Sequence, residues 1–232
     1  MKISANTIFS IFQNREIVLG EHIIGTNPDC NDFGCLPKTF TRQVQKYILH
    51  ESYNTSRIGG PYDLAMIRLN QSVPMSKQNT TPEESGVVPV CIPWSVNDPG
   101  RTLTTKANLL VTGWGRVTNN RRVNRQNYKR FRVATRTLKK LKVPAVSRKS
   151  CNQIDIFKNL NTDLQICAGG VVGEDSCNGD SGGPLVYRPT PDSPWYQVGI
   201  VSFGTSKCGV GQPGVYTRLS AFISWIQSHL EA

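Results

Sequence analysis

The sequence predicts an all-β protein that ends in an α-helix, with a length that two packed β-barrels would fit, and three observations support this. The chain has 232 residues, 38% of them hydrophobic, which suits a single domain with a sizeable core. Its apolar residues form short runs rich in β-branched and aromatic side chains, separated by proline and glycine. Apolar residues recur clearly at helical spacing only near the C-terminus.

Each predicted strand is a run of this kind bounded by turn-forming residues. In chain order the strands are VQKYIL (44–49), LAMIRL (64–69), LLVTGW (109–114), LKKLKV (138–143), PLVY (184–187), QVGIVSF (197–203) and VYT (215–217). The helix follows from the spacing of its apolar side chains, which would pack one face on a barrel: Phe222, Ile223, Trp225, Ile226 and Leu230. We expect the boundary between the barrels near residues 92–106.

The segment DSCNGDSGGP, residues 175–184, indicates acyl transfer. Ser181 is the candidate nucleophile, and the backbone N–H groups of Gly179 and Ser181 are candidate donors to the oxyanion. Glycines at 179, 182 and 183 would allow a tight turn that a substrate backbone can approach. Asp-Ser-Gly alone also suits an ordinary turn, so the indication comes from the whole segment.

Together with Cys177 and the strand at 184–187, this segment resembles the chymotrypsin/trypsin family of serine proteases. The small loop from Cys30 to Cys35 is typical of the arthropod clip-domain (easter-like, prophenoloxidase-activating) members. The resemblance covers 16–232 and implies a chymotrypsin-like double Greek-key β-barrel. It also implies a secreted trypsin-like endopeptidase that cleaves protein substrates after Arg or Lys and needs no cofactor.

The resemblance assigns roles to further residues. Asp63, in YDLAMIRL, would orient the catalytic base, although an ordinary aspartate at the head of a strand is the alternative. Asp180 would accept an ion pair from the amino terminus formed on activation; because that terminus is absent here, we expect its side chain to be free to turn away. Asp175 would lie at the base of the specificity pocket, and Ser202, Gly204 and Gly214 would be its other residues. The alternative is that Asp175 is an ordinary turn residue.

The catalytic histidine block of the family and its mature amino terminus are not found in this sequence. The chain has three histidines, and of these His22 lies 41 residues before Asp63, close to the spacing of a triad. Its surroundings, VLGEH, resemble instead a strand that follows the catalytic histidine. We therefore interpret residues 1–15 as an unmatched segment, 16–232 as a peptidase domain whose N-terminal portion is missing, and the first barrel as incomplete.

Two hypotheses about function follow. The first is a trypsin-like cascade protease represented by a truncated chain, which would be inactive because it lacks the general base. The second is a non-catalytic protease homologue that acts as a binding module or cascade cofactor. Retention of Ser181, Asp175 and Asp63 favours the first, and the absence of a suitable histidine favours the second for this polypeptide.

The seven cysteines and three glycosylation sequons indicate an extracellular protein. The resemblance implies the disulfides Cys30–Cys35, Cys151–Cys167 and Cys177–Cys208, and leaves Cys91 unpaired; its counterpart in the family holds the clip-bearing light chain. The sequons are at Asn54, Asn70 and Asn79. The alternative to these disulfides is a set of reduced thiols. A zinc site is disfavoured because the sequence lacks zinc-binding spacings of Cys and His. Residues 1–10 are not a credible signal peptide.

The charge of the chain is concentrated in one segment. Residues 116–142 hold eleven of the 27 Lys and Arg residues and no Asp or Glu, and this accounts for the net charge of +11. The segment is expected to be a surface loop that either binds a polyanion or is merely solvated. Nucleic acid is disfavoured because aromatic stacking partners are sparse, and no run is long enough to span a membrane. Calcium binding by the loop from Glu21 to Asp32 stays open.

Overall fold

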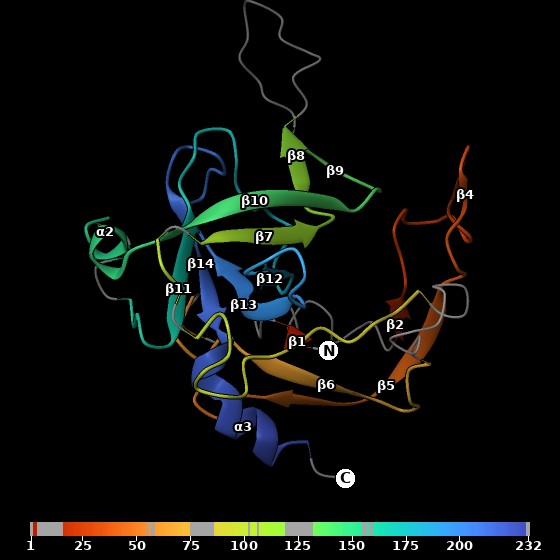
Figure 1. Cartoon of the computed structure of the whole chain (residues 1–232), viewed down its shortest axis with the longest axis horizontal. Coiled ribbons are helices and arrows are strands. Elements are labelled where there is room, and N and C mark those ends of the chain that lie inside the picture. The colour runs from red at the N-terminus through yellow and green to blue at the C-terminus, as the bar shows by residue number, and fades with distance from the viewer. Residues whose placement is uncertain are drawn as a thin grey trace, which may run out of the picture.

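The computed structural model describes residues 2–3, 16–54, 56, 59–74, 86–101, 103–105, 107–118, 132–154, 157 and 160–230, with the backbone alone at 2–3, 118 and 132–134. Two β-sheet units lie one above the other, with the C-terminal helix beside the lower one (Figure 1). The predicted all-β fold with a C-terminal helix is confirmed. Of the expected glycosylation sites, Asn79 lies outside the described residues.

The second unit is a closed barrel of six antiparallel strands in the order β10-β11-β14-β13-β12-β7. Its strands are β7 (Asn108–Gly113), β10 (Lys139–Val146), β11 (Gln165–Gly169), β12 (Pro184–Tyr187), β13 (Tyr196–Phe203) and β14 (Pro213–Arg218). All five residues of β11 are buried, as are six of the eight in β13. Closure leaves these strands no free edge, and their apolar side chains fill the barrel.

The first unit is a four-stranded sheet in the order β1-β6-β5-β2. It consists of β1 (Lys2–Ile3), β2 (Glu16–Leu19), β5 (Phe40–Leu49) and β6 (Ala65–Leu69). Its small core of Ile17, Ala65 and Ile67 explains why burial alternates along β6. The pairing of Lys2 and Ile3 with Met66 and Ala65 was not predicted, because two residues carry no detectable period.

The chain ends in a 3₁₀ turn (Leu219–Phe222) and the helix α3 (Ile223–Ser228). Leu219, Phe222 and Ile226 pack with Leu64 of the first unit and Ile200 of the second, so this cluster joins the two units. Leu230, predicted to face the core, follows the helix and is 57% exposed. The expected boundary between the barrels falls in the connection from β6 to β7, where Cys91 makes a single bridge to Tyr196 of β13.

The basic segment 116–142 is not one surface loop, which corrects the expectation. Its ends form a hairpin of β8 (Arg116–Thr118) and β9 (Arg132–Ala134), and Lys139, Lys140 and Lys142 belong to barrel strand β10. Residues 119–131 lie outside the described residues. Also unpredicted is the short helix α2 (Arg148–Asn152), whose N-cap Ser147 accepts a hydrogen bond from the Ser150 backbone. Strands β3 (Cys30–Asn31) and β4 (Gly34–Cys35) form a small hairpin at the expected clip-type loop.

Candidate active site

Asp63 is anchored where the two β units meet. It lies two residues before β6, and its side chain is completely buried. The Ser202 hydroxyl on β13 donates a hydrogen bond of 2.6 Å to Asp63 Oδ2, and the Thr217 hydroxyl on β14 donates one of 2.8 Å to the Asp63 backbone carbonyl. A buried carboxylate needs such donors, so the second barrel sets the position of an aspartate from the first unit.

Ser181 lies on an exposed turn that is fastened to β13. Gly182 N donates to Val201 O and Val201 N donates to Gly183 O, both at 2.9 Å, so the turn lies beside the strand that carries Ser202. Gly179 and Gly182 have φ angles of 100° and 80°, a region that side chains other than glycine rarely adopt. The turn thus presents the Ser181 side chain and neighbouring backbone to solvent.

Asp180 is held by backbone amides rather than free to turn away, which corrects the expectation. Its Oδ1 accepts a hydrogen bond from Gly115 N at 2.8 Å, and its Oδ2 accepts one from Cys177 N at 2.9 Å. A Cβ atom added at Gly113 or Gly115 would overlap the Asp180 carboxylate. The Gly-Trp-Gly sequence at 113–115 is therefore required sterically, a role that the sequence analysis missed although the paired glycines offered a signal.

Asp175 lies in a segment that the Cys177–Cys208 disulfide links to the loop after β13. Its Oδ2 accepts a hydrogen bond of 3.0 Å from Gly209 N, next to the Cys177–Cys208 bond. Beside it, Tyr216 is fully buried with its hydroxyl 3.3 Å from Ser176 Oγ. Burial raises the pKa of Tyr216 to about 12. Tyr216 had no sequence signal beyond its place in a strand.

The two predicted pocket glycines lie side by side. A Cβ atom at Gly204, after β13, would be 3.8 Å from the Cα of Gly214 on β14. Asp175 lines a cavity of about 410 Å³ together with Asp180, Gly113 and Gly115. Ser202, Gly204 and Gly214 are not among the lining residues of that cavity. The structure thus brings Asp175 and Asp180 to one cavity and leaves the pocket-wall residues outside it.

The three histidines lie in other surroundings. The His50 ring packs on Tyr62, Phe222 and Trp225, with centroids 4.9, 5.4 and 5.1 Å away. The His229 ring packs on Trp225. The backbone carbonyl of His22 accepts hydrogen bonds from Leu138 N and from the indole Nε1 of Trp114. Within the described part of the chain, no hydrogen bond joins an imidazole to Ser181 or Asp63.

The structure contains disulfides at the three pairs that the resemblance implies: Cys30–Cys35, Cys151–Cys167 and Cys177–Cys208. Cys91 is half-buried and forms no disulfide with a described residue. Asn54 and Asn70 are exposed. Their side chains accept hydrogen bonds from Ser56 N and Gln43 N.

Among the described residues, no group of three or more His, Cys, Asp or Glu side chains is arranged to hold a metal ion. In the loop from Glu21 to Asp32, Asp29 is turned inward and accepts hydrogen bonds from Thr26 Oγ1 and Ile23 N. The Thr26 hydroxyl is the main cause of the lowered pKa of Asp29. No helix in the described ranges is long and apolar enough to cross a membrane.

Comparison with known proteins gives consistent matches. A family model described as Trypsin matches residues 37–226. The CLIP domain-containing serine protease HP8 of Bombyx mori is 33% identical over 99% of this chain and 57% of its own length, and the serine protease grass of Drosophila melanogaster is 32% identical over 91% and 52%. The crystal structure of the Drosophila Grass clip serine protease of the Toll pathway has a TM-score of 0.70 at 29% identity, covering 97% of this chain and 59% of that chain. The chain spans about half the length of the curated relatives it matches.

Proposed function

The chain belongs to the trypsin family of serine proteases, and on this premise we propose that it is the trypsin-like endopeptidase domain of a secreted proteolytic cascade, cleaving protein substrates after Arg or Lys. The observation that carries the proposal is the buried contact between Ser202 and Asp63. This hydrogen bond holds the Asp63 carboxylate, which is expected to orient the base, beside β13. The turn that carries Ser181 is attached to the same strand. The names of the relatives, which are serine proteases, favour this function over a non-catalytic homologue.

In the proposed reaction, Ser181 Oγ attacks the carbonyl carbon of the scissile peptide bond. The backbone N–H groups of Gly179 and Ser181 stabilise the negative charge on the carbonyl oxygen. In a longer form of the protein, Asp63 would orient an imidazole that takes the serine proton. Selection for Arg or Lys comes from Asp175, because an uncharged side chain would leave a desolvated carboxylate without a counter-ion. Ser202, Gly204 and Gly214 would line the remaining walls of the specificity pocket.

The cavity that Asp175 and Asp180 share supports a role in activation. Asp180 lines it, and the two amides that bind its carboxylate belong to neighbouring backbone. We propose that an amino-terminal group enters this cavity and forms an ion pair with Asp180, as the resemblance implies. Such a pair would draw the carboxylate from the amides and reorder the Gly179–Ser181 turn.

Residues 1–232 by themselves are proposed to lack amidolytic activity, because the His50 and His229 rings pack on aromatic side chains and no imidazole in the described ranges forms a hydrogen bond with Ser181 or Asp63. The test is turnover of a chromogenic peptide-Arg substrate by the refolded chain with its disulfides formed. No turnover is expected. Turnover that disappears in Ser181→Ala would contradict the proposed inactivity and show that one of the three histidines serves as the base.

Labelling by a fluorophosphonate separates the two parts of the proposal. Slow labelling that is lost in Ser181→Ala would support a residual nucleophile in an inactive chain. The same labelling in the variant would remove the role given to Ser181.

Cys91 is the proposed attachment point of a clip-bearing light chain in a longer protein, since it carries a thiol outside the three disulfides.

A further inference from the structure

A second cavity, of about 250 Å³, lies at the far end of the closed barrel from the basic hairpin. Its lining combines the connection before β7, the end of β10, the helix α2, and the ends of β11 and β14. Three of the lining residues are arginines, namely Arg101, Arg148 and Arg218, and none is Asp or Glu. The concentration of like charge around one hollow calls for a counter-ion.

Arg218 is half-buried and its guanidinium is incompletely paired. Its Nη2 donates hydrogen bonds of 3.2 Å to the carbonyls of Thr162 and Gln165. Its Nε–H is buried without an acceptor in the described part of the molecule, and Nη1 donates none of the hydrogen bonds found there. Burial, reinforced by the charge of Arg148, lowers the pKa of Arg218, but a guanidinium keeps its proton in proteins.

The other two arginines differ in how they are held. Arg101 donates to the carbonyls of Ser95, Trp94 and Ser220, which fixes its guanidinium without cancelling its charge. Arg148 is 60% exposed and forms an ion pair of 2.7 Å with Asp163, itself 77% exposed. Among the described residues, Asp163 is the one carboxylate within ion-pair distance of any of the three.

Hydroxyl groups complete the lining at Thr105, Ser147 and Thr162. Guanidinium groups with neighbouring hydroxyls are the donors that bind tetrahedral oxoanions, because planar N–H pairs match two oxygens of one anion. We propose that this cavity is a binding site for a sulfate or phosphate group, with Arg218 and Arg148 as its charged ligands, Arg101 as a fixed neighbouring charge and Asp163 as a competitor for Arg148.

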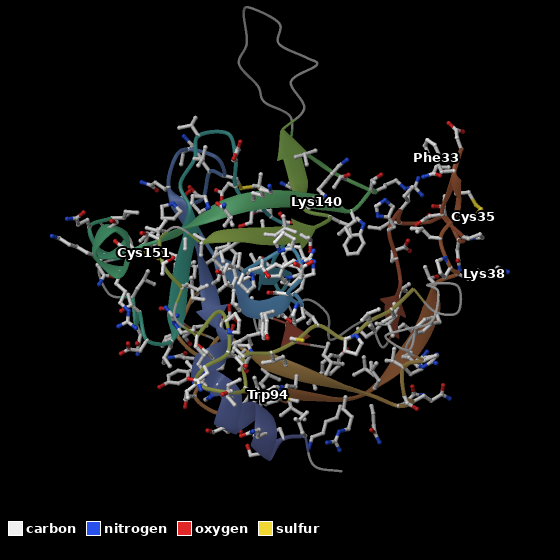
Figure 2. The ribbon with its side chains drawn as sticks, in the orientation of Figure 1. Phe33, Cys35, Lys38, Trp94, Lys140 and Cys151 are labelled. Carbon is white, nitrogen blue, oxygen red and sulfur yellow. A yellow bond between two sulfur atoms is a disulfide. The ribbon has the colours of Figure 1, made fainter. Side chains whose placement is uncertain are left out.

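This site is distinct from the lysines of β10. Figure 2 shows Lys140 on β10 apart from Cys151 on α2, a residue of the cavity lining. Lys140 lines the other cavity, beside Asp175 and Asp180. A charge-removing substitution at Lys140 therefore serves as a control for attraction by the overall positive charge.

The experiment is calorimetric titration of the whole chain with sodium sulfate, at an ionic strength kept constant with sodium chloride. We expect saturable binding at one site, with a dissociation constant on the order of 1 mM. Titrations with inorganic phosphate and with a sulfated disaccharide identify the source of the group. Binding of either free anion indicates a site for small ions, and binding of the disaccharide alone indicates a site for a sulfate ester. Failure of all three to saturate would overturn the proposal.

Two variants at exposed positions test the assignment without threatening the core. Arg148→Gln should weaken sulfate binding by about tenfold, whereas Asp163→Asn should tighten it several-fold because it frees Arg148. Lys140→Gln should leave binding unchanged within about twofold, since screening limits a distant charge. Unchanged affinity in Arg148→Gln, or an equal loss in Lys140→Gln, would show that the arginine cavity is not the site.

Discussion

The Ser202 hydroxyl donates a 2.6 Å hydrogen bond to Asp63, a residue 139 positions earlier in the chain and completely buried. The partners come from different β units, so the bond ties the first sheet to the closed barrel. Thr217 adds a second bond to the Asp63 backbone.

Removing the Ser202 hydroxyl should destabilise the fold. Ser202→Ala leaves a buried carboxylate short of one donor, and we expect the free energy of unfolding to fall by about 1–3 kcal/mol. Urea denaturation followed by tryptophan fluorescence measures it. Ser206→Ala, at an exposed position, is the matched control and should change stability by less than about 0.5 kcal/mol. Equal stability of the two variants would mean that the bond contributes nothing.

The steric requirement at Gly113 predicts coupling with Asp180. Because a Cβ atom would overlap the Asp180 carboxylate, Gly113→Ala should cost about 1–3 kcal/mol of stability. The loss should be smaller in an Asp180→Ala background, where the obstructing group is gone. A double-mutant cycle from chemical denaturation gives the coupling energy. Strict additivity would show that the two side groups do not compete for space.

Asp175 should bind cationic ligands at the proposed specificity pocket. We expect p-aminobenzamidine, followed by its fluorescence, to bind the wild-type chain and to lose about tenfold or more in affinity in Asp175→Asn. Glu174→Gln is the control, because this neighbouring carboxylate lines the same cavity but is exposed. If both variants lose affinity equally, general negative charge rather than Asp175 attracts the ligand.

Protonation of His50 should weaken the contact between α3 and the first sheet. Its side chain is only 12% exposed among aromatic rings, and burial lowers its pKa, with Glu51 opposing and His229 adding to the effect. The unfolded chain then binds more protons, so stability rises with pH. The contribution of His50 is fully present above a pH of about 6.5 and is lost as the pH falls below it.

Thermal unfolding at pH values of about 7.5 and 5.5 measures this dependence, on either side of the unperturbed histidine pKa. His50→Phe keeps a ring in the cluster and removes the titrating group, so its midpoint should change less between the two conditions than that of the wild type. His22→Asn, outside the cluster, should keep the wild-type dependence. A His50→Phe chain with the full wild-type dependence would assign the effect to other groups.

One thiol should be available for alkylation in the oxidised chain. Cys91 is half-buried and outside the three disulfides. Iodoacetamide without reductant should add a single label, more slowly than in urea, as judged by intact mass. Cys91→Ser should remain unlabelled, and more than one label on the folded wild type would contradict the disulfide set.

The strands that could be predicted are those with a short run rich in apolar, mostly β-branched or aromatic residues. Every residue of the predicted run 197–203 is apolar or glycine apart from Gln197 and Ser202, and β13 lies there (Tyr196–Phe203). The run 138–143 was also predicted as a strand, but its lysines were at the same time assigned to a basic surface loop. Both assignments can be explained by β10, because the Val143 side chain faces the inside of the barrel and the lysine side chains face outward. By contrast, β1 depends on the unpaired edge of β6, a partner that local sequence does not reveal.

The sequence alone determined which kind of reaction this protein is expected to catalyse. The evidence for it consists of local patterns: the segment around Ser181, the aspartates and the spacing of the cysteines. Tertiary structure decided which of them meet. It placed Ser202 on Asp63, bound Asp180 to the amides of Gly115 and Cys177, and gathered three arginines around one cavity. The reason is physical: buried charges need partners, and the partner of a buried charge is chosen by how distant strands pack, which no short stretch of residues encodes.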